Sequence, residues 1–330
     1  MSLLEVRDVN VAYRPAGGTR VWSVRDVSFD LAPGEFVGLV GESGCGKSTL
    51  GFSLTRMLRP PAVLEGGSIT FDGVDLAGLS EQQVRSQRRN GIALVLQAGM
   101  NALSPVRSIE HHFHDILAAH SGDKPSRAAA RARGAELLDK VQLDASVLQR
   151  YPHELSGGMR QRVAIALALA LEPKMIVFDE PTTALDVVVQ AAVMRTIKQL
   201  QAEQGFTALL ISHDLGVVLE ATDRVMVMYA GEIVEDQPSH QLLTGTHHPY
   251  TEALLSCYAD PRAETIELGG IPGSPPDLSL AQAGCPFTPR CPLAIEQCSA
   301  IDPPLTRHGA GLVACHVRAP STESKEAAGV

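Results

Sequence analysis

The sequence has no run of apolar residues long enough to cross a membrane. Its longest uninterrupted run, residues 163–171, is far shorter than the roughly 20 residues that a transmembrane helix needs. The N-terminus has neither a basic start nor an apolar signal core, so we expect no secretion signal. If this protein works at a membrane, we expect it to do so as a peripheral subunit.

The sequence also lacks a surplus of positive charge. It has 28 Lys and Arg against 37 Asp and Glu, which gives a formal net charge of -9. Binding to nucleic acid requires clustered basic residues, so nucleic acid is not an expected partner. With 330 residues, 45% of them hydrophobic, the chain can bury one large core and one small one.

The pattern of apolar residues predicts an α/β fold. Near-alternate apolar positions in residues 4–13 and 24–31 are typical of half-buried antiparallel strands. Short apolar runs at 35–40, 175–178, 207–211 and 224–229 predict buried strands, most of them parallel. Residues 97–155 are helical in pattern and indicate an insertion.

The amino-acid composition of the sequence changes after Pro238. Ten of the 21 prolines fall between residues 261 and 320, which is too many for a packed sheet or a helix bundle. We therefore expect a principal domain at 1–239, a small Pro- and Cys-rich C-terminal domain at 240–320, and a disordered tail at 321–330.

Residues 41–49 match the G-x-x-x-x-G-K-[ST] phosphate loop, with a strand before them and a helix expected from residue 47. Glycines let backbone N–H groups curl around phosphate oxygens. Lys47 would neutralise the β- and γ-phosphates, and the Ser48 hydroxyl would hold Mg²⁺. The residues expected to contact the nucleotide are Gly41, Ser43, Gly44, Cys45, Gly46, Lys47, Ser48 and Thr49. The position of Cys45, at a helix N-terminus beside Lys47, predicts a lowered thiol pKa.

Two further motifs are expected to contribute to the nucleotide site, one with carboxylates and one with hydrogen-bond donors for an anion. Asp179 and Glu180 end the apolar run 175–178, as expected of carboxylates at the edge of a parallel sheet, and Asp179 would hold Mg²⁺ through its water shell. Ser156, Gly157 and Gly158 would begin a helix whose first N–H groups form an anion site.

The string LSGGM at 155–159, between the phosphate loop and the acidic strand end, resembles the signature of the ATP-binding cassette (ABC) family. The resemblance implies a P-loop NTPase core with a parallel sheet, an antiparallel β subdomain and a helical subdomain at about 97–158. It also implies that ATP and Mg²⁺ bind between two ABC ATPase subunits, in a homodimer or heterodimer. The signature of each subunit would meet the γ-phosphate held by the other.

The same resemblance assigns roles to single residues by their position. Glu180 would orient and deprotonate the attacking water, Gln97 would sense Mg²⁺ and the water, and His213 would contact the γ-phosphate. Asp186 would link the two sites of the dimer, and Tyr13 would stack on adenine.

Four of the six cysteines, Cys285, Cys291, Cys298 and Cys315, lie in the last 46 residues. Structural disulfides are rare in the reducing compartment that an ATP-dependent protein without a secretion signal occupies. Together with the segments 248–255 and 271–276, these cysteines resemble the C-terminal extension of oligopeptide and dipeptide importer ATPases. That resemblance implies a [4Fe-4S] cluster; zinc and free thiols remain alternatives.

The resemblance as a whole implies the ATPase subunit of a binding-protein-dependent importer. It would lie on the cytoplasmic face of the inner membrane and bind two integral permease subunits near residues 97–105. An extracytoplasmic substrate-binding protein would be an indirect partner. The implied cargo is a peptide, with nickel chelates or oligosaccharides as alternatives. A soluble ABC ATPase not tied to transport is a second class, whereas a catalytically dead cassette is disfavoured because Lys47, Glu180 and His213 are present.

Overall fold

The computed structural model describes residues 2–96, 103–120, 125–183, 185–245, 247–257, 270–280 and 282–318. The chain divides into two compact units. The first comprises residues 1–31, 37–77 and 211–330, and the second comprises residues 32–36 and 78–210. Within the described ranges, no helix combines the length and apolar composition needed to cross a bilayer.

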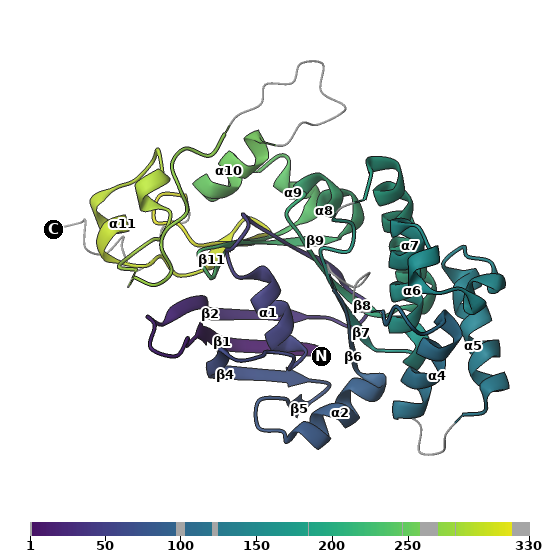
Figure 1. Cartoon of the computed structure of the whole chain (residues 1–330). Coiled ribbons are helices and arrows are strands. Elements are labelled where there is room, and N and C mark those ends of the chain that lie inside the picture. Colours follow the sequence, from purple (N-terminus) through teal and green to yellow (C-terminus); the bar gives the residue numbers. More distant parts are fainter. Residues whose placement is uncertain are drawn as a thin grey trace. The chain divides into compact units, whose positions relative to one another are not determined.

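The first unit contains an antiparallel sheet with the strand order β2-β1-β4-β5. Its strands are β1 (Leu4–Tyr13), β2 (Val21–Leu31), β4 (Ala62–Phe71) and β5 (Val74–Asp75). Helix α1 (Lys47–Leu54) packs against β1 and β2 (Figure 1). The alternation of apolar residues in the sequence therefore identified β1 and β2 correctly.

The first unit also holds a run of strands in the order β11-β12-β10-β9-β3. Strand β3 (Phe36–Val40) is parallel to β9 (Arg224–Tyr229), and β9 forms a hairpin with β10 (Glu232–Pro238). The turn uses Ala230 and Gly231, both with positive φ. Strands β11 (Thr306–His308) and β12 (Gly311–Val313) then extend the sheet through β10. The high proline content of the tail argued against a packed sheet, so the sequence did not predict that β11 and β12 join one.

The remaining helices of the first unit are short. They are α8 (Leu215–Ala221), α9 (Ser239–Leu242), α10 (Pro249–Ser256), α11 (Glu296–Ala300) and the 3-10 turn η4 (Thr288–Arg290). Gly38 in β3 lies against α8: a Cβ there would be 2.1 Å from the Val218 side chain. Glycine at this position therefore permits close packing of helix on strand.

The second unit has the strands β6 (Ile92–Val95) and β7 (Met175–Asp179) and most of β8 (Thr207–Ser212), which ends in the first unit. Strands β6 and β7 are parallel, and β8 lies next to β7. Every residue of β7 and β8 is buried, which explains why these strands appear in the sequence as continuous apolar runs. The mixed α/β class expected from the sequence is confirmed.

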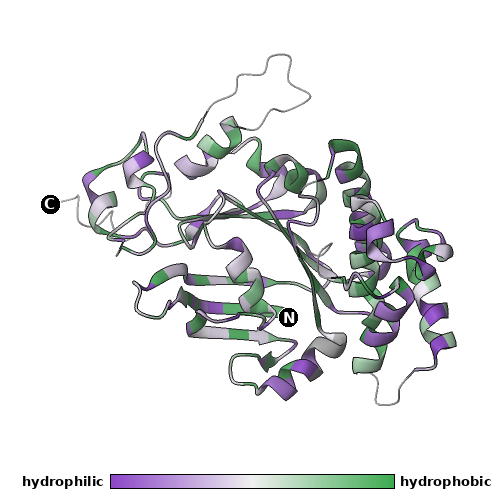
Figure 2. Cartoon of the chain, in the orientation of Figure 1, coloured by the Kyte–Doolittle hydropathy of each residue, from purple (hydrophilic) through white to green (hydrophobic). Residues whose placement is uncertain are grey.

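The second unit also contains a set of helices. They are α2 (Glu81–Asn90), α4 (Ile109–His120), α5 (Arg127–Lys140), α6 (Gly157–Ala168) and α7 (Val187–Gln204), with the 3-10 turns η1 (Ala145–Gln149), η2 (Pro152–Glu154) and η3 (Leu169–Leu171). Helix α5 buries Ala130, Gly134, Leu137 and Leu138, a spacing that forms one face. Figure 2 accordingly shows both hydrophobic and hydrophilic residues along the outer helices α4 and α5.

Candidate functional site

The phosphate loop at 41–49 depends on glycine at two close approaches. Gly41 and Gly46 have φ angles of 155° and 109°. A Cβ at Gly41 would lie 2.1 Å from the Met228 carbonyl oxygen, and one at Gly46 would lie 2.0 Å from the Ser23 carbonyl oxygen. Because both obstacles are backbone atoms, neither can move aside cheaply. The loop can adopt this path only with glycine at both positions.

Lys47 is folded back into the loop. Its Nζ donates hydrogen bonds to the carbonyl oxygens of Gly41 (2.8 Å) and Glu42 (2.9 Å). The residue is only 5% exposed, and these acceptors offset the lost hydration of the ammonium group. A buried positive charge is therefore already in place where the loop pattern takes phosphate.

The prediction that Cys45 has a lowered thiol pKa is wrong. Burial of Cys45 raises its pKa above the ordinary value, and the nearby Lys47 charge, with Nζ 3.7 Å from Sγ, opposes this shift but does not reverse it. The sequence showed the helix N-terminus and the lysine, but it did not show that the thiol is enclosed. Cys45 is a buried, protonated thiol.

Tyr13 lies at the end of β1, close to the phosphate loop. Its hydroxyl and the Thr49 hydroxyl are 3.1 Å apart, and the Ser23 hydroxyl donates to Thr49 Oγ1 at 3.0 Å. Thr49 belongs to the first turn of α1. The structure therefore brings the predicted adenine contact next to the predicted phosphate contacts within the first unit.

Asp179 and Glu180 lie where β7 ends in the second unit. Asp179 is only 4% exposed, and Glu180 adopts a φ of 47°, which turns the chain away from the strand direction. The Thr183 hydroxyl donates to Glu180 Oε2 at 2.8 Å. This bond fixes the glutamate side chain, and no motif in the sequence pointed to Thr183.

Three of the other predicted residues lie close together in the second unit. Ser156 caps α6, with its Oγ accepting from Met159 N at 3.3 Å, and Asp186 caps α7, with its Oδ1 accepting from Val189 N at 2.9 Å. A Cβ on Gly158 would lie 2.5 Å from Val189 Cγ1. Glycine therefore lets the starts of α6 and α7 meet, which places the signature beside Asp186.

His213 and Gln97 are the other two predicted catalytic residues. His213 directly follows β8 and is exposed. Gln97 lies outside the described residues, as do Met100, Asn101 and Ala102 of the segment expected to dock a permease and the tail at 321–330.

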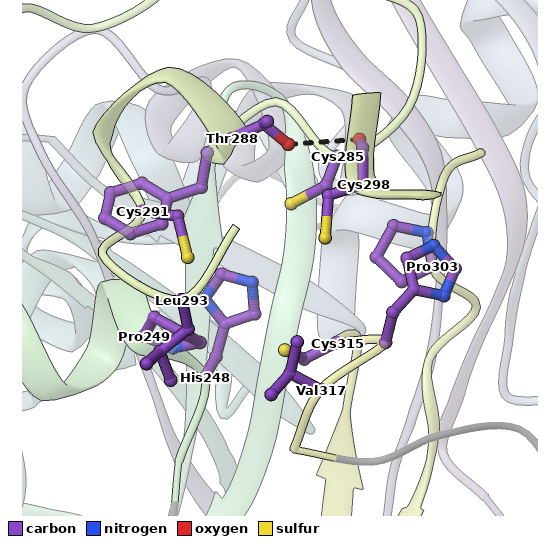
Figure 3. A pocket seen from close by; sticks show the side chains of 12 residues that line it. His248, Pro249, Cys285, Thr288, Cys291, Leu293, Cys298, Pro303, Cys315 and Val317 are labelled. Atoms are coloured by element: carbon purple, nitrogen blue, oxygen red, sulfur yellow. Dashed lines mark hydrogen bonds between the residues drawn. The ribbon is translucent and has the colours of Figure 1, made fainter. Parts of the chain in front are cut away.

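Cys285, Cys291, Cys298 and Cys315 line one cavity, and all four thiols point into it (Figure 3). Its wall also includes His248, whose pKa burial lowers to about 3, so that the ring is neutral at physiological pH. The hollow has a volume of about 10 Å³, which is room for about one water molecule. The sequence analysis predicted that these four cysteines form one site, and the fold brings them to one cavity.

Burial keeps two of the thiols, Cys285 and Cys291, protonated. It raises the pKa of Cys285 to about 12 and raises that of Cys291 as well. Among the described residues, no three Cys, His, Asp or Glu side chains are close enough together to hold one metal ion. The four thiols thus have the chemistry of a metal or cluster site, but they are not preassembled around a single ion.

Two family models match the chain. The model described as ABC transporter matches residues 24–183. The model described as oligopeptide/dipeptide transporter, C-terminal region, matches residues 234–298. The first covers the phosphate loop and the signature, and the second covers three of the four clustered cysteines.

Relatives resemble the chain over nearly its whole length. A protein described as a putative peptide import ATP-binding protein of Brucella abortus (strain 2308) is 43% identical over 97% of this chain and 96% of its own. Oligopeptide transport ATP-binding protein OppD of Salmonella typhimurium is 40% identical over 95% of this chain and 93% of its own.

One solved structure has a similar fold over much of the chain. It is the ATP-binding cassette MJ0796, in a dimeric post-hydrolysis state bound to ADP and Pi. The similarity has a TM-score of 0.65 at 28% identity, and it covers 72% of this chain and 98% of that one.

Proposed function

The chain belongs to the ABC transporter family, and we propose that it is the ATP-hydrolysing subunit of an importer of dipeptides and oligopeptides. The observation that carries the proposal is the pairing, in one chain, of a preformed phosphate loop with the C-terminal region of oligopeptide and dipeptide transporters. Relatives named for peptide import cover that whole arrangement.

The ATP phosphates would lie in the loop at 41–49. Lys47 supplies positive charge to the β- and γ-phosphates, and the backbone N–H groups around Gly44 and Gly46 supply hydrogen-bond donors. Ser48 and Asp179 would hold Mg²⁺, since hydroxyl and carboxylate oxygens are the ligands this ion prefers. When bound, Mg²⁺ would neutralise charge on the phosphate oxygens.

Hydrolysis would use Glu180, Gln97 and His213. Glu180 accepts a proton from the attacking water, in an orientation supported by the Thr183 hydrogen bond. Gln97 and His213 would contact the water and the γ-phosphate, respectively. We assign adenine stacking to Tyr13.

A second ATPase subunit would complete the site. The first N–H groups of α6, with Ser156, Gly157 and Gly158, would bind the γ-phosphate held by the partner. Asp186 would lie at the junction between the two sites. Beside it, Val187 and Val188 are 82% and 76% exposed, an apolar pair that a partner subunit would cover. The dimeric state of the related cassette supports this arrangement.

Two permease subunits would dock on the second unit. An apolar pocket of about 360 Å³ lies there, and its walls include Leu96, Leu103, Ile116 and Leu167. Leu96 directly precedes the segment expected to contact the permeases, and Leu103 belongs to that segment. We therefore place the protein at the cytoplasmic face of the inner membrane, receiving peptides that an extracytoplasmic substrate-binding protein delivers. Nickel chelates and oligosaccharides remain alternative cargoes.

We propose that the four-cysteine cavity of the C-terminal region, which we place at 240–320, holds a [4Fe-4S] cluster. The proposal is supported by the convergence of the four cysteines on one cavity and by the proline that follows Cys285 and Cys291, since Cys-Pro also ends the iron-sulfur run of bacterial ferredoxins. When bound, the cluster would cross-link the proline-rich tail. Absorption near 400 nm with about four irons per chain would support this, whereas stoichiometric zinc, or metal-free thiols, would overturn it.

The test of the proposed function is Glu180→Gln in the complex with the permeases. We expect ATP turnover and peptide uptake to fall by roughly 100- to 10,000-fold while ATP still binds and accumulates between the subunits. Unchanged turnover would contradict the assignment of the base. Ser156→Arg should stop turnover at the partner's loop yet leave ATP binding at its own loop intact. Loss of that binding instead would contradict the trans arrangement.

A further inference from the structure

Glu42 is the second residue of the phosphate loop, and three side chains hold it. Lys47 donates to its carbonyl oxygen at 2.9 Å. Its backbone N–H donates to the Tyr250 hydroxyl at 2.8 Å. Its carboxylate accepts two hydrogen bonds from Arg290, at 2.7 and 3.1 Å. Two of these three side chains come from the C-terminal part of the chain, more than 200 residues away.

Arg290 is fully engaged in this contact. Its side chain is 4% exposed. Besides Glu42, its guanidinium donates to the Pro272 and Ile271 carbonyl oxygens and to the Tyr229 hydroxyl. The Glu42 carboxylate raises the pKa of Arg290, so the arginine stays charged. A side chain fixed by this many bonds has one geometry, and it holds Glu42 in one geometry as well.

We propose that Arg290 is a positioning residue for ATP binding: it neutralises Glu42 and fixes the first turn of the phosphate loop. This inference rests on the proposed ATP site. Without Arg290, the loop that must receive a polyanion would present an uncompensated carboxylate, and like charges at short range in a partly buried site repel strongly. With Arg290 in place, the net charge of the Glu42–Arg290 pair is zero, and Lys47 remains available to phosphate.

The surroundings of Arg290 explain how a residue of the C-terminal tail can hold the phosphate loop. Phe287, which is 1% exposed, packs edge-on against Tyr229 and Tyr250, with ring centroids 5.2 and 5.4 Å away. The guanidinium lies 5.8 Å from the Tyr229 ring. Arg290 directly precedes Cys291, so one short segment carries both the contact to the loop and a wall of the four-cysteine cavity. The aromatic cluster anchors that segment on β9.

The experiment compares MgATP affinity among full-length variants by titration with a fluorescent ATP analogue. Arg290→Ala should raise the Kd about tenfold, and adding Glu42→Gln to it should restore most of the affinity, because the repelling carboxylate is then gone. Arg290→Lys should fall between, since a lysine keeps the charge but not the two-pronged geometry. The matched control is Arg318→Ala. It breaks the pair that Arg318 makes with Glu252 in the same tail without touching the loop.

Several outcomes would overturn the inference. If Arg290→Ala and Arg318→Ala change the Kd equally, the effect is general loosening of the tail. If Glu42→Gln fails to restore the ATP affinity of Arg290→Ala, neutralisation of Glu42 is not the cause.

Salt provides a further test. The increase in Kd caused by Arg290→Ala should be smaller at high salt, because screening weakens charge repulsion. If the parent chain itself does not bind MgATP, the proposed function fails, whereas normal parent binding with an unaffected Arg290→Ala variant refutes only the role of Arg290.

Discussion

The phosphate loop and the four-cysteine cavity are both built for binding, but they are assembled differently. The loop consists of consecutive residues whose path is set by glycines at fixed offsets. The cavity collects thiols from positions 285 to 315 and is closed by a histidine from the start of α10. When consecutive residues form a site, the sequence predicts both its residues and its geometry. When residues from separate segments form a site, the sequence predicts only which residues are available, not how they are arranged.

The two sites also differ in the side chains that they enclose. In the loop, the carbonyl oxygens of Gly41 and Glu42 accept hydrogen bonds from the Lys47 ammonium group and hold it where the loop pattern takes phosphate. In the cavity, burial raises the pKa of Cys285 and Cys291, so these two thiols are neutral at physiological pH. The loop is therefore preorganised for phosphate, whereas the proposed cluster would first have to displace the protons of these two thiols.

The largest effect should come from breaking the loop geometry itself. Gly46→Ala places a Cβ about 2.0 Å from the Ser23 carbonyl oxygen, so the loop must distort. We expect MgATP affinity to fall by at least about 100-fold, as titration with a fluorescent ATP analogue would measure. Gly44→Ala is the matched control. It also imposes a positive φ, of 83°, on alanine, but its Cβ meets nothing within 4 Å. A loss of only about fivefold is expected there, and equal losses in both variants would show that backbone conformation, not the close approach, limits the loop.

The next effect tests the dependence of the cavity on its ligand. Cys298→Ser removes one buried thiol and should abolish metal or cluster binding, lowering the melting temperature by roughly 5–10 °C. Metal content and thermal unfolding of the purified full-length protein measure this. The matched control, Cys257→Ser, changes an exposed thiol on the same C-terminal part of the chain and should leave both quantities unchanged. A Cys298→Ser protein with full metal content would show that the cavity is not the binding site.

Thiol reactivity offers a finer comparison. Cys45 in the loop is buried and Cys285 in the cavity is half-buried. Burial raises the pKa of both thiols, so both should react slowly with iodoacetamide at a pH of about 7.5. Exposed Cys257 should react at least about 100 times faster. Mass spectrometry of peptides from briefly alkylated native protein would rank them. Fast labelling of Cys45 would restore the idea of a reactive thiol in the loop.

The smallest effect concerns Glu232, which follows the turn between β9 and β10. It pairs with Arg25 at 2.7 Å, yet burial and the nearby Asp302 of the tail raise its pKa to about 8. The folded protein therefore binds a proton that the unfolded chain releases above about pH 4.5, so stability falls as pH rises from about 4.5 to 8. Glu232→Gln should flatten this slope and stabilise the protein by on the order of 1 kcal/mol at about pH 8. Urea unfolding at about pH 5.5 and about pH 8 measures it, and parallel pH profiles for variant and parent would contradict the assignment.

Sequence reasoning succeeded where the signal was local. The strands β1, β3, β7 and β9 and the start of α1 at Lys47 follow from short-range apolar patterns and one loop motif. It failed where burial decided the chemistry: the lysine beside Cys45 predicted a low pKa, but enclosure of the thiol has the larger effect.

Long-range contacts escaped sequence reasoning altogether. Glu42 occupies a variable position of the loop pattern, and Arg290 lies among prolines, 248 residues away. No periodicity connects them. The strand β12 is three residues long, too short to show an alternating pattern, and its pairing partner lies more than 70 residues earlier.

The pairing of β12 with β10 sets a limit on how such proteins can be recombined. Glu235 and Asp236 of β10 have their register partners in Val313 and Leu312. A truncated chain that ends near residue 240 would leave this edge of the sheet open to pairing with other chains. Exchanging tails between related subunits should therefore succeed only when the junction lies upstream of β9, so that the hairpin and its third strand are inherited as one piece.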